Sequence, residues 1–238
     1  MKKGVIVYFV IFLAGFTLFA QEPGIEVILS GHYQASGLEK LKNVNTIVMS
    51  GTIIQNDAMP VKIIRKRPDQ YLMEFDVMDM TTYQAYDGTR AWSTAPWTGT
   101  AKAQPMPEDR ARDLKSRADF DGILVDWKTK GHLVEYSGID TVDNLQVYHL
   151  KVTKSDGSVE NLFVGTRDYL LKKRSYIRMS RGKEVVVENI FLDYRQVDGI
   201  PFSYKQETYF GGQLYNTLQL DEVLLNEPVD SKIFSMPE

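Results

Sequence analysis

The stretch VKIIRKRPDQYLMEFDVM, residues 61–78, decides the fold. Apolar and polar side chains alternate in it on both sides of Pro68-Asp69, a dipeptide typical of turns. Successive side chains of a strand point to opposite faces, so a period of two is typical of antiparallel strands with one buried face. The stretch therefore predicts two antiparallel strands that share one apolar face.

The same alternation recurs on both sides of this stretch, from residue 45 to residue 225. Turn dipeptides separate the alternating segments, and Asp87-Gly88 and Asp156-Gly157 are the strongest hairpin signals among them. At this even spacing we expect roughly ten or eleven strands in a sandwich or barrel-like arrangement. A sheet this long with few helices curls, so we expect its apolar face to be concave.

Helical signals are confined to short segments. Residues 24–42 carry apolar side chains at helical spacing, and residues 107–117 follow them as a helical insertion that Pro107 can begin. Residues 228–234 predict one further short turn. So few helices can cover only part of the concave face, and a partly covered apolar hollow suits an apolar ligand.

The composition excludes several chemistries. The chain has 238 residues and no cysteine, which rules out disulfides, thiol nucleophiles, cysteine-based metal sites and a lipid attached to an N-terminal cysteine. A net charge of −3 argues against nucleic-acid binding. We find no linker and no internal repeat, so we expect residues 21–238 to form a single domain.

Residues 1–20 have the pattern of a secretory signal peptide. Two lysines precede an uncharged run, residues 4–20, and the small residue Ala20 ends it. This run is short for a transmembrane anchor, which needs about 20 apolar residues. An uncleaved anchor is the alternative, since Leu18 stands where a small residue is usual. Cleavage after Ala20 would leave 218 residues, and we expect the mature protein in the periplasm.

No catalytic or metal-binding constellation stands out in the sequence. The three histidines lack metal-ligand spacing, and no nucleophile elbow or phosphate-binding loop occurs. Glu135 and Glu188 would suit glycoside hydrolysis only at a separation that the sequence does not determine. We therefore expect no catalytic residue, no metal and no cofactor.

The candidate ligand-binding residues are apolar side chains that alternate along the strands. Methionine is flexible and suits adaptable apolar surfaces, while an ordinary core is the alternative for any one position. The residues expected to line a cavity are Met49, Tyr71, Met73, Phe75, Tyr83, Trp92, Tyr148, Leu150, Phe202, Tyr204, Leu218 and Leu220.

Three motifs occur in a familiar order. They are Lys66-Arg67-Pro68-Asp69-Gln70-Tyr71-Leu72-Met73, the pair Asp87-Gly88-Thr89-Arg90-Ala91-Trp92 and Ala95-Pro96-Trp97, and the ending Ile233-Phe234-Ser235-Met236-Pro237. They resemble the Lys-Arg-Pro-Asn strand, the Asp-Gly-Lys-x-x-Trp…Asn-Pro-Phe hairpin and the Phe-x-Phe-x-Pro ending of the LolA family, periplasmic carriers of outer-membrane lipoproteins. The resemblance implies a mainly β fold, a half-open antiparallel barrel with helices as a lid over a hydrophobic cavity.

The resemblance also implies a role for single residues. Arg67 aligns with the family arginine that hydrogen-bonds the lid backbone and holds the closed state, and a guanidinium with five donors suits that task. Tyr71 and Met73 align with cavity positions, where Met73 replaces a large aromatic. Residues 119–130 have no clear counterpart in the family.

We therefore expect a monomeric carrier that binds acyl chains of lipoproteins, or lipids, and sorts them to the outer membrane without nucleic acid. The resemblance implies an inner-membrane complex that releases the cargo to it and an outer-membrane acceptor. Two alternatives stay open, namely a non-enzymatic envelope-stress sensor or scaffold of the same fold, and an envelope hydrolase with an unrecognised site.

Overall fold

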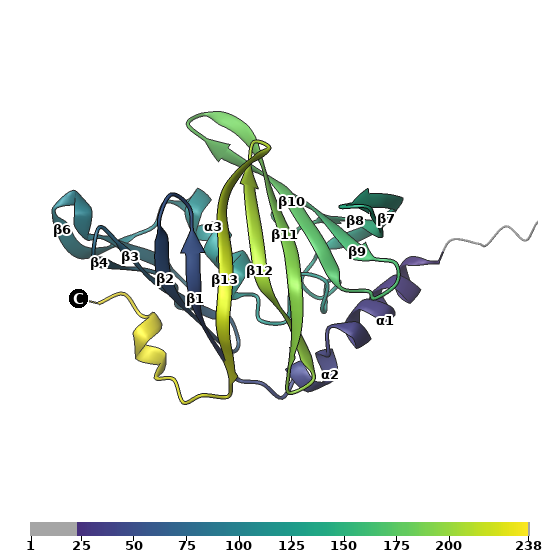
Figure 1. The fold of residues 1–238 in the computed structure, drawn as a ribbon, viewed down its shortest axis with the longest axis horizontal. Helices are drawn as coiled ribbons and strands as arrows, with labels where there is room; N and C mark the ends of the chain where they lie inside the picture. The colour runs from purple at the N-terminus through teal and green to yellow at the C-terminus, as the bar shows by residue number, and fades with distance from the viewer. Residues whose placement is uncertain (1–22, 238) are drawn as a thin grey trace, which may run out of the picture.

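The computed structural model describes residues 23–237, which form mainly β-structure (Figure 1). The helices are α1 (Ile25–Ala35), α2 (Leu38–Leu41), α3 (Glu108–Ala118) and the short 3-10 helices η1 (Pro96–Thr98) and η2 (Ser231–Phe234). The strands before α3 are β1 (Thr46–Ile54), β2 (Ala58–Lys66), β3 (Gln70–Val77), β4 (Met80–Tyr86), β5 (Ala91–Ala95) and β6 (Thr100–Pro105). The strands after it are β7 (Leu133–Val142), β8 (Leu145–Thr153), β9 (Val159–Gly165), β10 (Leu171–Ser180), β11 (Lys183–Val197), β12 (Ile200–Phe210) and β13 (Gln213–Leu225).

Within the described chain, one antiparallel sheet of thirteen strands holds all of these in the order β6-β5-β4-β3-β2-β1-β13-β12-β11-β10-β9-β8-β7. Most pairings join strands that follow one another in the chain, whereas β1 and β13 pair across the whole chain length and join the two halves. Gly51 lies at a bulge of this pairing, where a Cβ atom would collide with the carbonyl oxygen of Gln219.

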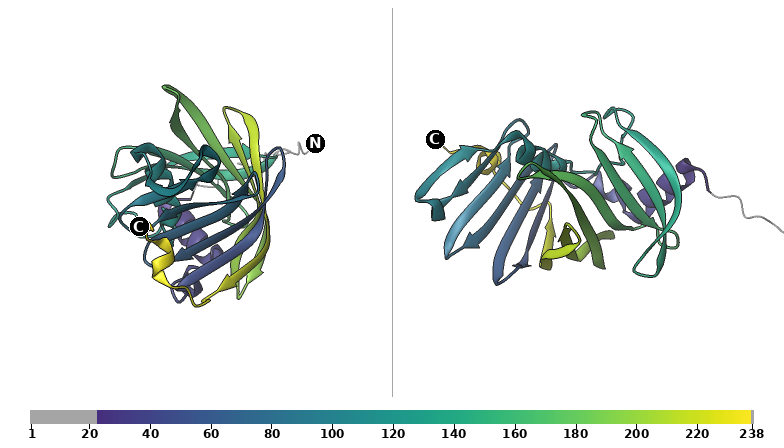
Figure 2. Two further views of the ribbon diagram at one scale, coloured as in Figure 1. Left: turned by 90° about the vertical axis from the view of Figure 1, so that its left-hand side faces the viewer. Right: turned by 90° about the horizontal axis from the view of Figure 1, so that it is seen from above.

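The sheet is curved but not closed into a barrel. Its edge strands β6 and β7 lie at opposite ends of the molecule (Figure 1), and the sheet wraps around the helices between them (Figure 2). Antiparallel strands twist, and thirteen of them accumulate enough twist to curl into a half-barrel. The result is one concave and one convex face.

Helices fill the two ends of the concave face. Helix α1 buries Ile28 and Leu29 against the inner side chains of β7, β8 and β9. Helix α3 buries Leu114 and Ala118 against the inner side chains of β2 to β5. Ile28 and Leu29 are adjacent and Leu114 and Ala118 are four residues apart, and both spacings occur within the apolar face of an amphipathic helix. Neither helix covers the middle of the concave face, which lies between α1 and α3.

The C-terminal segment covers part of the convex face. Phe234 of η2 is fully buried among Ile64, Leu72 and Trp92, which point away from the concave side. The indole Nε1 of Trp92 donates to the carbonyl oxygen of Phe234 at 2.7 Å. Lys66 Nζ donates to the carbonyl oxygen of Val229 at 2.7 Å. The chain end is therefore packed and hydrogen-bonded to the outside of the first half of the sheet.

The structure confirms the predicted fold class and refines its details. Both expected hairpins occur, between β4 and β5 and between β8 and β9. The sheet has thirteen strands in the described residues rather than ten or eleven, and the helical segment 24–42 divides at Gly37, a residue in the left-handed conformation. The predicted signal peptide lies outside the described residues. Over residues 23–237, no helix combines the length and the apolar character needed to span a bilayer.

The buried ring of Phe234 supports a first prediction. Phe234→Ala leaves a cavity under η2, so we expect the free energy of unfolding to fall by about 3 to 5 kcal/mol in urea denaturation. Ile233→Ala, at a neighbour with 39% exposure, is the matched control and should cost much less. Equal losses for the two variants would contradict the packing of the chain end described above.

Candidate functional site

The middle of the concave face, which neither α1 nor α3 fills, is a cavity of about 1140 Å³. Its walls are the inner side chains of β1 to β3 and β9 to β13, one side of α3 and residues 119–125, with single residues of α1 and α2. Pockets for small molecules typically measure roughly 300–1,000 Å³. The cavity is therefore large enough for a ligand bigger than an ordinary small molecule.

One wall of the cavity is apolar. Six of the residues predicted from the sequence line it, and they come from strands on both sides of the β1–β13 junction: Met49, Tyr71, Met73, Phe202, Leu218 and Leu220. Ile53 and Ile63 extend the same surface. The alternation seen in the sequence thus brings together side chains up to 171 residues apart.

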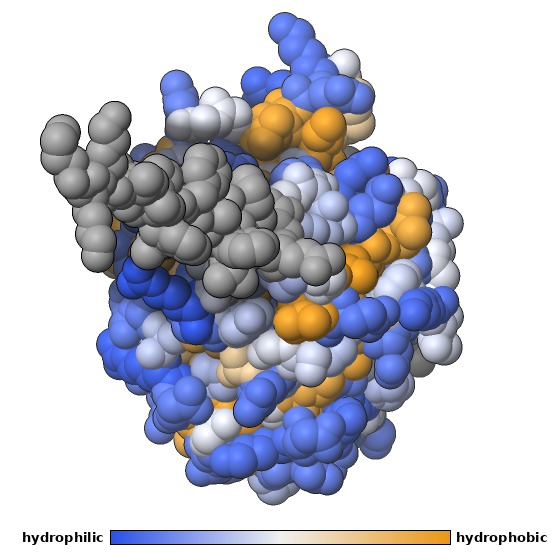
Figure 3. Space-filling view, turned by 90° about the vertical axis from the view of Figure 1, so that its right-hand side faces the viewer, coloured by the Kyte–Doolittle hydropathy of each residue, from blue (hydrophilic) through white to orange (hydrophobic). Residues whose placement is uncertain are grey.

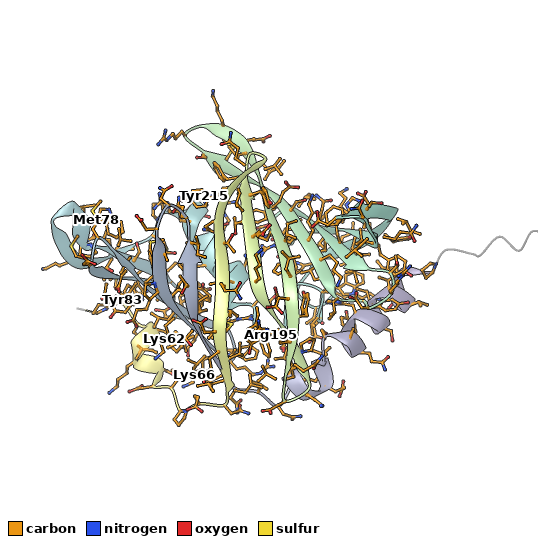
Figure 4. The ribbon with its side chains drawn as sticks, viewed as in Figure 1. Lys62, Lys66, Met78, Tyr83, Arg195 and Tyr215 are labelled. Carbon is orange, nitrogen blue, oxygen red and sulfur yellow. The ribbon has the colours of Figure 1, made fainter. Side chains whose placement is uncertain are left out.

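Two predicted cavity residues lie on the opposite face. Tyr83 and Trp92 belong to the cluster around Phe234 on the convex side, and the view with side chains places Tyr83 on the part of the sheet that η2 covers (Figure 4). Their prediction as cavity residues needs correction. The sequence pattern shows apolar side chains on both faces of β4 and β5, because the C-terminal segment gives the convex face a core of its own.

Four others lie on the concave side or in its clusters but outside the cavity lining. Tyr148 and Leu150 are buried under α1, where the Tyr148 ring lies 6.1 Å from that of Tyr136. Tyr204 is buried in the cluster around Ile200, and Phe75 packs with the residues under α3. The structure therefore does not place these four in the lining, although Phe75 shares its strand face with Tyr71 and Met73.

The other wall of the cavity is cationic, which the sequence-based prediction missed. Among the described residues that line the cavity, six are arginines and three are carboxylates, in a chain whose net charge is −3. The arginines are Arg65, Arg110, Arg117, Arg174, Arg178 and Arg181, and the carboxylates are Asp119, Asp121 and Glu160. The signal was available, since Arg174, Tyr176 and Arg178 stand two residues apart along β10 and therefore share its inward face.

The loop that connects α3 to β7 closes the cavity. This covering loop, residues 119–132, is held on one side by β2, where Arg65 Nη2 donates to the carbonyl oxygen of Asp119 at 2.5 Å. On the other side the hydroxyl of Tyr33 in α1 donates to the carbonyl oxygen of Leu124 at 2.6 Å. Lys130 fixes the loop internally through the carboxylate of Asp119. The loop is thus held in place by polar contacts to elements on both sides of the cavity.

Arg67 connects three segments at this point. Its Nη1 and Nη2 donate to the Asp121 carboxylate at 2.7 and 2.6 Å, and its Nε and Nη2 donate to the carbonyl oxygens of Val44 and Leu41 at 2.7 and 2.9 Å. Its guanidinium also lies 4.2 Å from the centre of the Phe120 ring. Arg67 therefore joins the covering loop to the chain between α2 and β1. It stands behind the loop and does not line the cavity, and its role in closing the cavity remains a prediction.

Electrostatics maintain the charged state of these groups. Hydrogen bonds from Arg67 hold the pKa of Asp121 below its ordinary value. Burial alone would raise the pKa of Glu160, but Arg174 and Lys154 outweigh it and hold that pKa below its ordinary value. Arg174 donates to Glu160 at 2.6 Å and to the hydroxyl of Ser116 at 3.0 Å. Glu160 therefore orients the Arg174 guanidinium against the end of α3.

Two hairpins form the rim of the cavity. The β10–β11 and β12–β13 hairpins extend beyond the rest of the sheet (Figure 1), and Met179 and Tyr215, both about half exposed, are at once rim and lining residues. Apolar surface gathers just below the charged tip of this projection (Figure 3). Exposed apolar residues on the two hairpins also include Ile177, Val186 and Leu214. The cavity thus opens toward an exposed apolar rim.

Over the described part of the chain, no group of three or more His, Asp or Glu side chains is arranged to hold a metal ion. Glu135 forms an ion pair with Lys151 on the adjacent strand, and Glu188 pairs with Lys173. Neither glutamate lines the cavity.

Comparison with known proteins identifies the fold. No protein-family model matches the sequence, and no curated protein matches it significantly. Solved structures do match. A DUF1329 family protein from Desulfovibrio piger superposes with a TM-score of 0.62 at 13% identity, over 87% of this chain and 97% of that one. A LolA superfamily protein from Nitrosomonas europaea superposes with a TM-score of 0.60 at 13% identity, over 88% of this chain and 96% of that one.

A domain of the outer membrane lipoprotein-sorting type from Vibrio parahaemolyticus is similar as well, with a TM-score of 0.57 at 12% identity, over 88% of this chain and 96% of that one. The chain therefore has a LolA-like fold, as the sequence motifs imply.

The depressed pKa of Asp121 supports a prediction about stability and pH. A carboxylate whose pKa is lowered by folding stabilises the protein above its unfolded pKa, about 3.9, and this contribution is lost as the pH falls through the folded value. We expect Asp121→Asn to lower the free energy of unfolding by about 1 to 3 kcal/mol at pH 7. The difference from the unmodified protein should shrink below about pH 4.

Urea unfolding at a series of pH values measures this difference. Asp57→Asn, at an exposed turn position, is the control and should stay within about 0.5 kcal/mol of the unmodified protein at each pH. A destabilisation by Asp121→Asn that is the same at pH 7 and pH 3 would show that the ion pair with Arg67 is not its cause.

Proposed function

We propose that this protein is a periplasmic carrier that holds acyl chains of lipoproteins, or of lipids, in the cavity for sorting to the outer membrane. The observation that carries the proposal is the continuous apolar wall made by the neighbouring strands β3, β2, β1, β13 and β12 inside an unclosed sheet. The LolA-like fold is consistent with it. The proposal includes a membrane complex that delivers cargo and an acceptor that takes it up.

The energetics favour acyl chains as the ligand. Burying one methylene group gains about 0.8 kcal/mol, so a chain of about a dozen methylenes gains roughly 10 kcal/mol before the costs of ordering. An apolar wall with flexible methionines can adapt to chains of different shape. Such binding would be too tight for handover unless an opposing process weakened it.

The contacts of the covering loop supply an opposing process. A closed, empty state that is stabilised by the bonds of Arg65, Arg67 and Tyr33 to the covering loop competes with the cargo-bound state. The apparent affinity then falls in proportion to the fraction of molecules that are open. Carrier function therefore needs no ATP or metal, because the fold itself sets the balance between holding and releasing. The exposed apolar rim is suited to transfer at a membrane surface.

The binding of acyl chains is tested by a charge placed in the apolar wall. Leu218→Asp puts a carboxylate where a chain would lie, and we expect a fluorescent palmitoylated peptide to bind more than tenfold more weakly. Leu224→Asp, on the same strand at an exposed position outside the cavity, is the matched control and should bind as the unmodified protein does. Circular dichroism of both variants checks that they fold. Unchanged binding by folded Leu218→Asp would rule out this wall as the acyl site.

The role of Arg67 in closure is tested by release. Arg67→Leu removes the bonds to Leu41, Val44 and Asp121, so opening costs less and cargo is held longer. We expect roughly tenfold slower transfer of the palmitoylated peptide to acceptor vesicles. Arg67→Lys keeps the charge but loses the paired hydrogen bonds to Asp121, so its transfer rate should lie between those of Arg67→Leu and the unmodified protein. Arg90→Leu, in the exposed β4–β5 turn, should transfer normally; an Arg67→Leu variant that folds and transfers at the normal rate would exclude the closing role.

A further inference from the structure

The cationic wall contains a small polar recess at the side of the main cavity. The recess measures about 100 Å³ and is lined by Asp113, Arg117, Arg174, Tyr176, Asn189, Phe191 and Gln206. All of these except Asp113 also line the main cavity, so the recess opens into it. An apolar ligand would make no favourable contact at such a site. The hydrogen-bond donors of the recess would lose their bonds to water and gain no partner in the ligand.

The positive charge of the recess exceeds the negative charge near it. The carboxylate of Asp113 pairs with Arg178, whose Nη1 lies 3.6 Å from it. The carboxylate of Glu160 pairs with both Arg174 and Lys154. Arg117 takes part in none of the ion pairs found among the described residues. Tyr71 and, to a smaller extent, Tyr176 and Asp113 raise the pKa of Arg117 against the opposing effect of burial. A guanidinium stays charged in proteins, so Arg117 is a cation beside an apolar wall.

The position of Arg117 follows from the spacing of α3. Leu114 and Ala118 point into the packed side of the helix, and Arg110 and Arg117, seven residues apart, share the side that faces the cavity. Arg174 approaches from β10 and is fixed by Glu160 and Ser116. Two guanidinium groups from different elements therefore converge on one recess, together with the hydroxyl of Tyr176 and the amides of Asn189 and Gln206.

We propose that this recess binds the anionic headgroup of an amphiphile whose acyl chains occupy the apolar wall. A phosphate group matches the donors, since guanidinium forks bind its oxygens in pairs and the neutral donors can take the rest. This inference rests on the proposed carrier function and adds a selection rule to it. The carrier distinguishes phosphate-bearing lipids from neutral ones, although both fill the same apolar wall.

The test uses three ligands that separate head from chain. Palmitoyl lysophosphatidic acid carries both, monopalmitoylglycerol carries the chain without the phosphate, and glycerol 3-phosphate carries the phosphate without the chain. Titration calorimetry below the micelle concentration gives the three affinities for a protein of residues 21–238. We expect lysophosphatidic acid to bind at least about tenfold more tightly than monopalmitoylglycerol, and glycerol 3-phosphate to bind far more weakly than either.

The variants assign the headgroup contact. Arg117→Gln should remove the preference for lysophosphatidic acid and leave the affinity for monopalmitoylglycerol unchanged. Arg112→Gln, an exposed position of the same helix outside the cavity lining, should keep the preference.

The outcomes distinguish the two proposals. Equal affinity of the unmodified protein for the two palmitoyl ligands, or an equal loss for both in Arg117→Gln, would overturn the headgroup site while the carrier function stands. Binding of glycerol 3-phosphate as tight as that of lysophosphatidic acid would make the recess a site for a free anion and overturn the lipid assignment. Failure of both palmitoyl ligands to bind would contradict the carrier function itself, and the headgroup site with it.

Discussion

The pairing of β1 with β13 is the constraint on which the rest of the structure depends. It joins strands from the two ends of the chain, in register from Ile47↔Leu225 to Ile54↔Thr217, and so makes one sheet out of two halves. Without it, β1 and β13 would be exposed edges and neither half would complete the hollow. The cavity lies across this junction, since Met49 lines it from β1 and Leu218 and Leu220 line it from β13.

An unclosed sheet leaves a concave apolar face that must be covered, and the cover determines what the face can bind. Helices α1 and α3 bury its two ends, while the middle is closed only by the covering loop, which Arg65 and Arg67 hold through hydrogen bonds. A hydrophobic contact would be broken only at the cost of exposing apolar surface, whereas polar contacts exchange with water at a small net cost. The covering loop also buries Phe120 and Leu124 in the core clusters, so opening it would break apolar as well as polar contacts.

The alternation of side chains predicts the sheet well, because it reports which side chains share a strand face. It predicts the hairpins at Asp87-Gly88 and Asp156-Gly157 and half of the expected lining residues. The prediction of cavity residues fails for Trp92 and Leu150 for a common reason. The strand pattern shows which side chains share a face, but it does not show which distant segment covers that face. Trp92 is covered by η2, and Leu150 is covered by α1. Arg174 and Arg178 share the inward face of β10 with Tyr176. Arg65 likewise shares the period of Val61 and Ile63 on β2, so arginines on inward faces were the available sign of cationic groups in the cavity.

The proposed carrier function requires that the cavity hold acyl chains in the living cell. Native mass spectrometry of the protein, purified without detergent from its own cells, tests this requirement. We expect a mass increase that organic extraction removes and that fragmentation identifies as a lipid or an acylated protein. A protein that carries no such ligand, and that is found instead with a stoichiometric protein partner or with turnover of envelope glycans or esters, would contradict it.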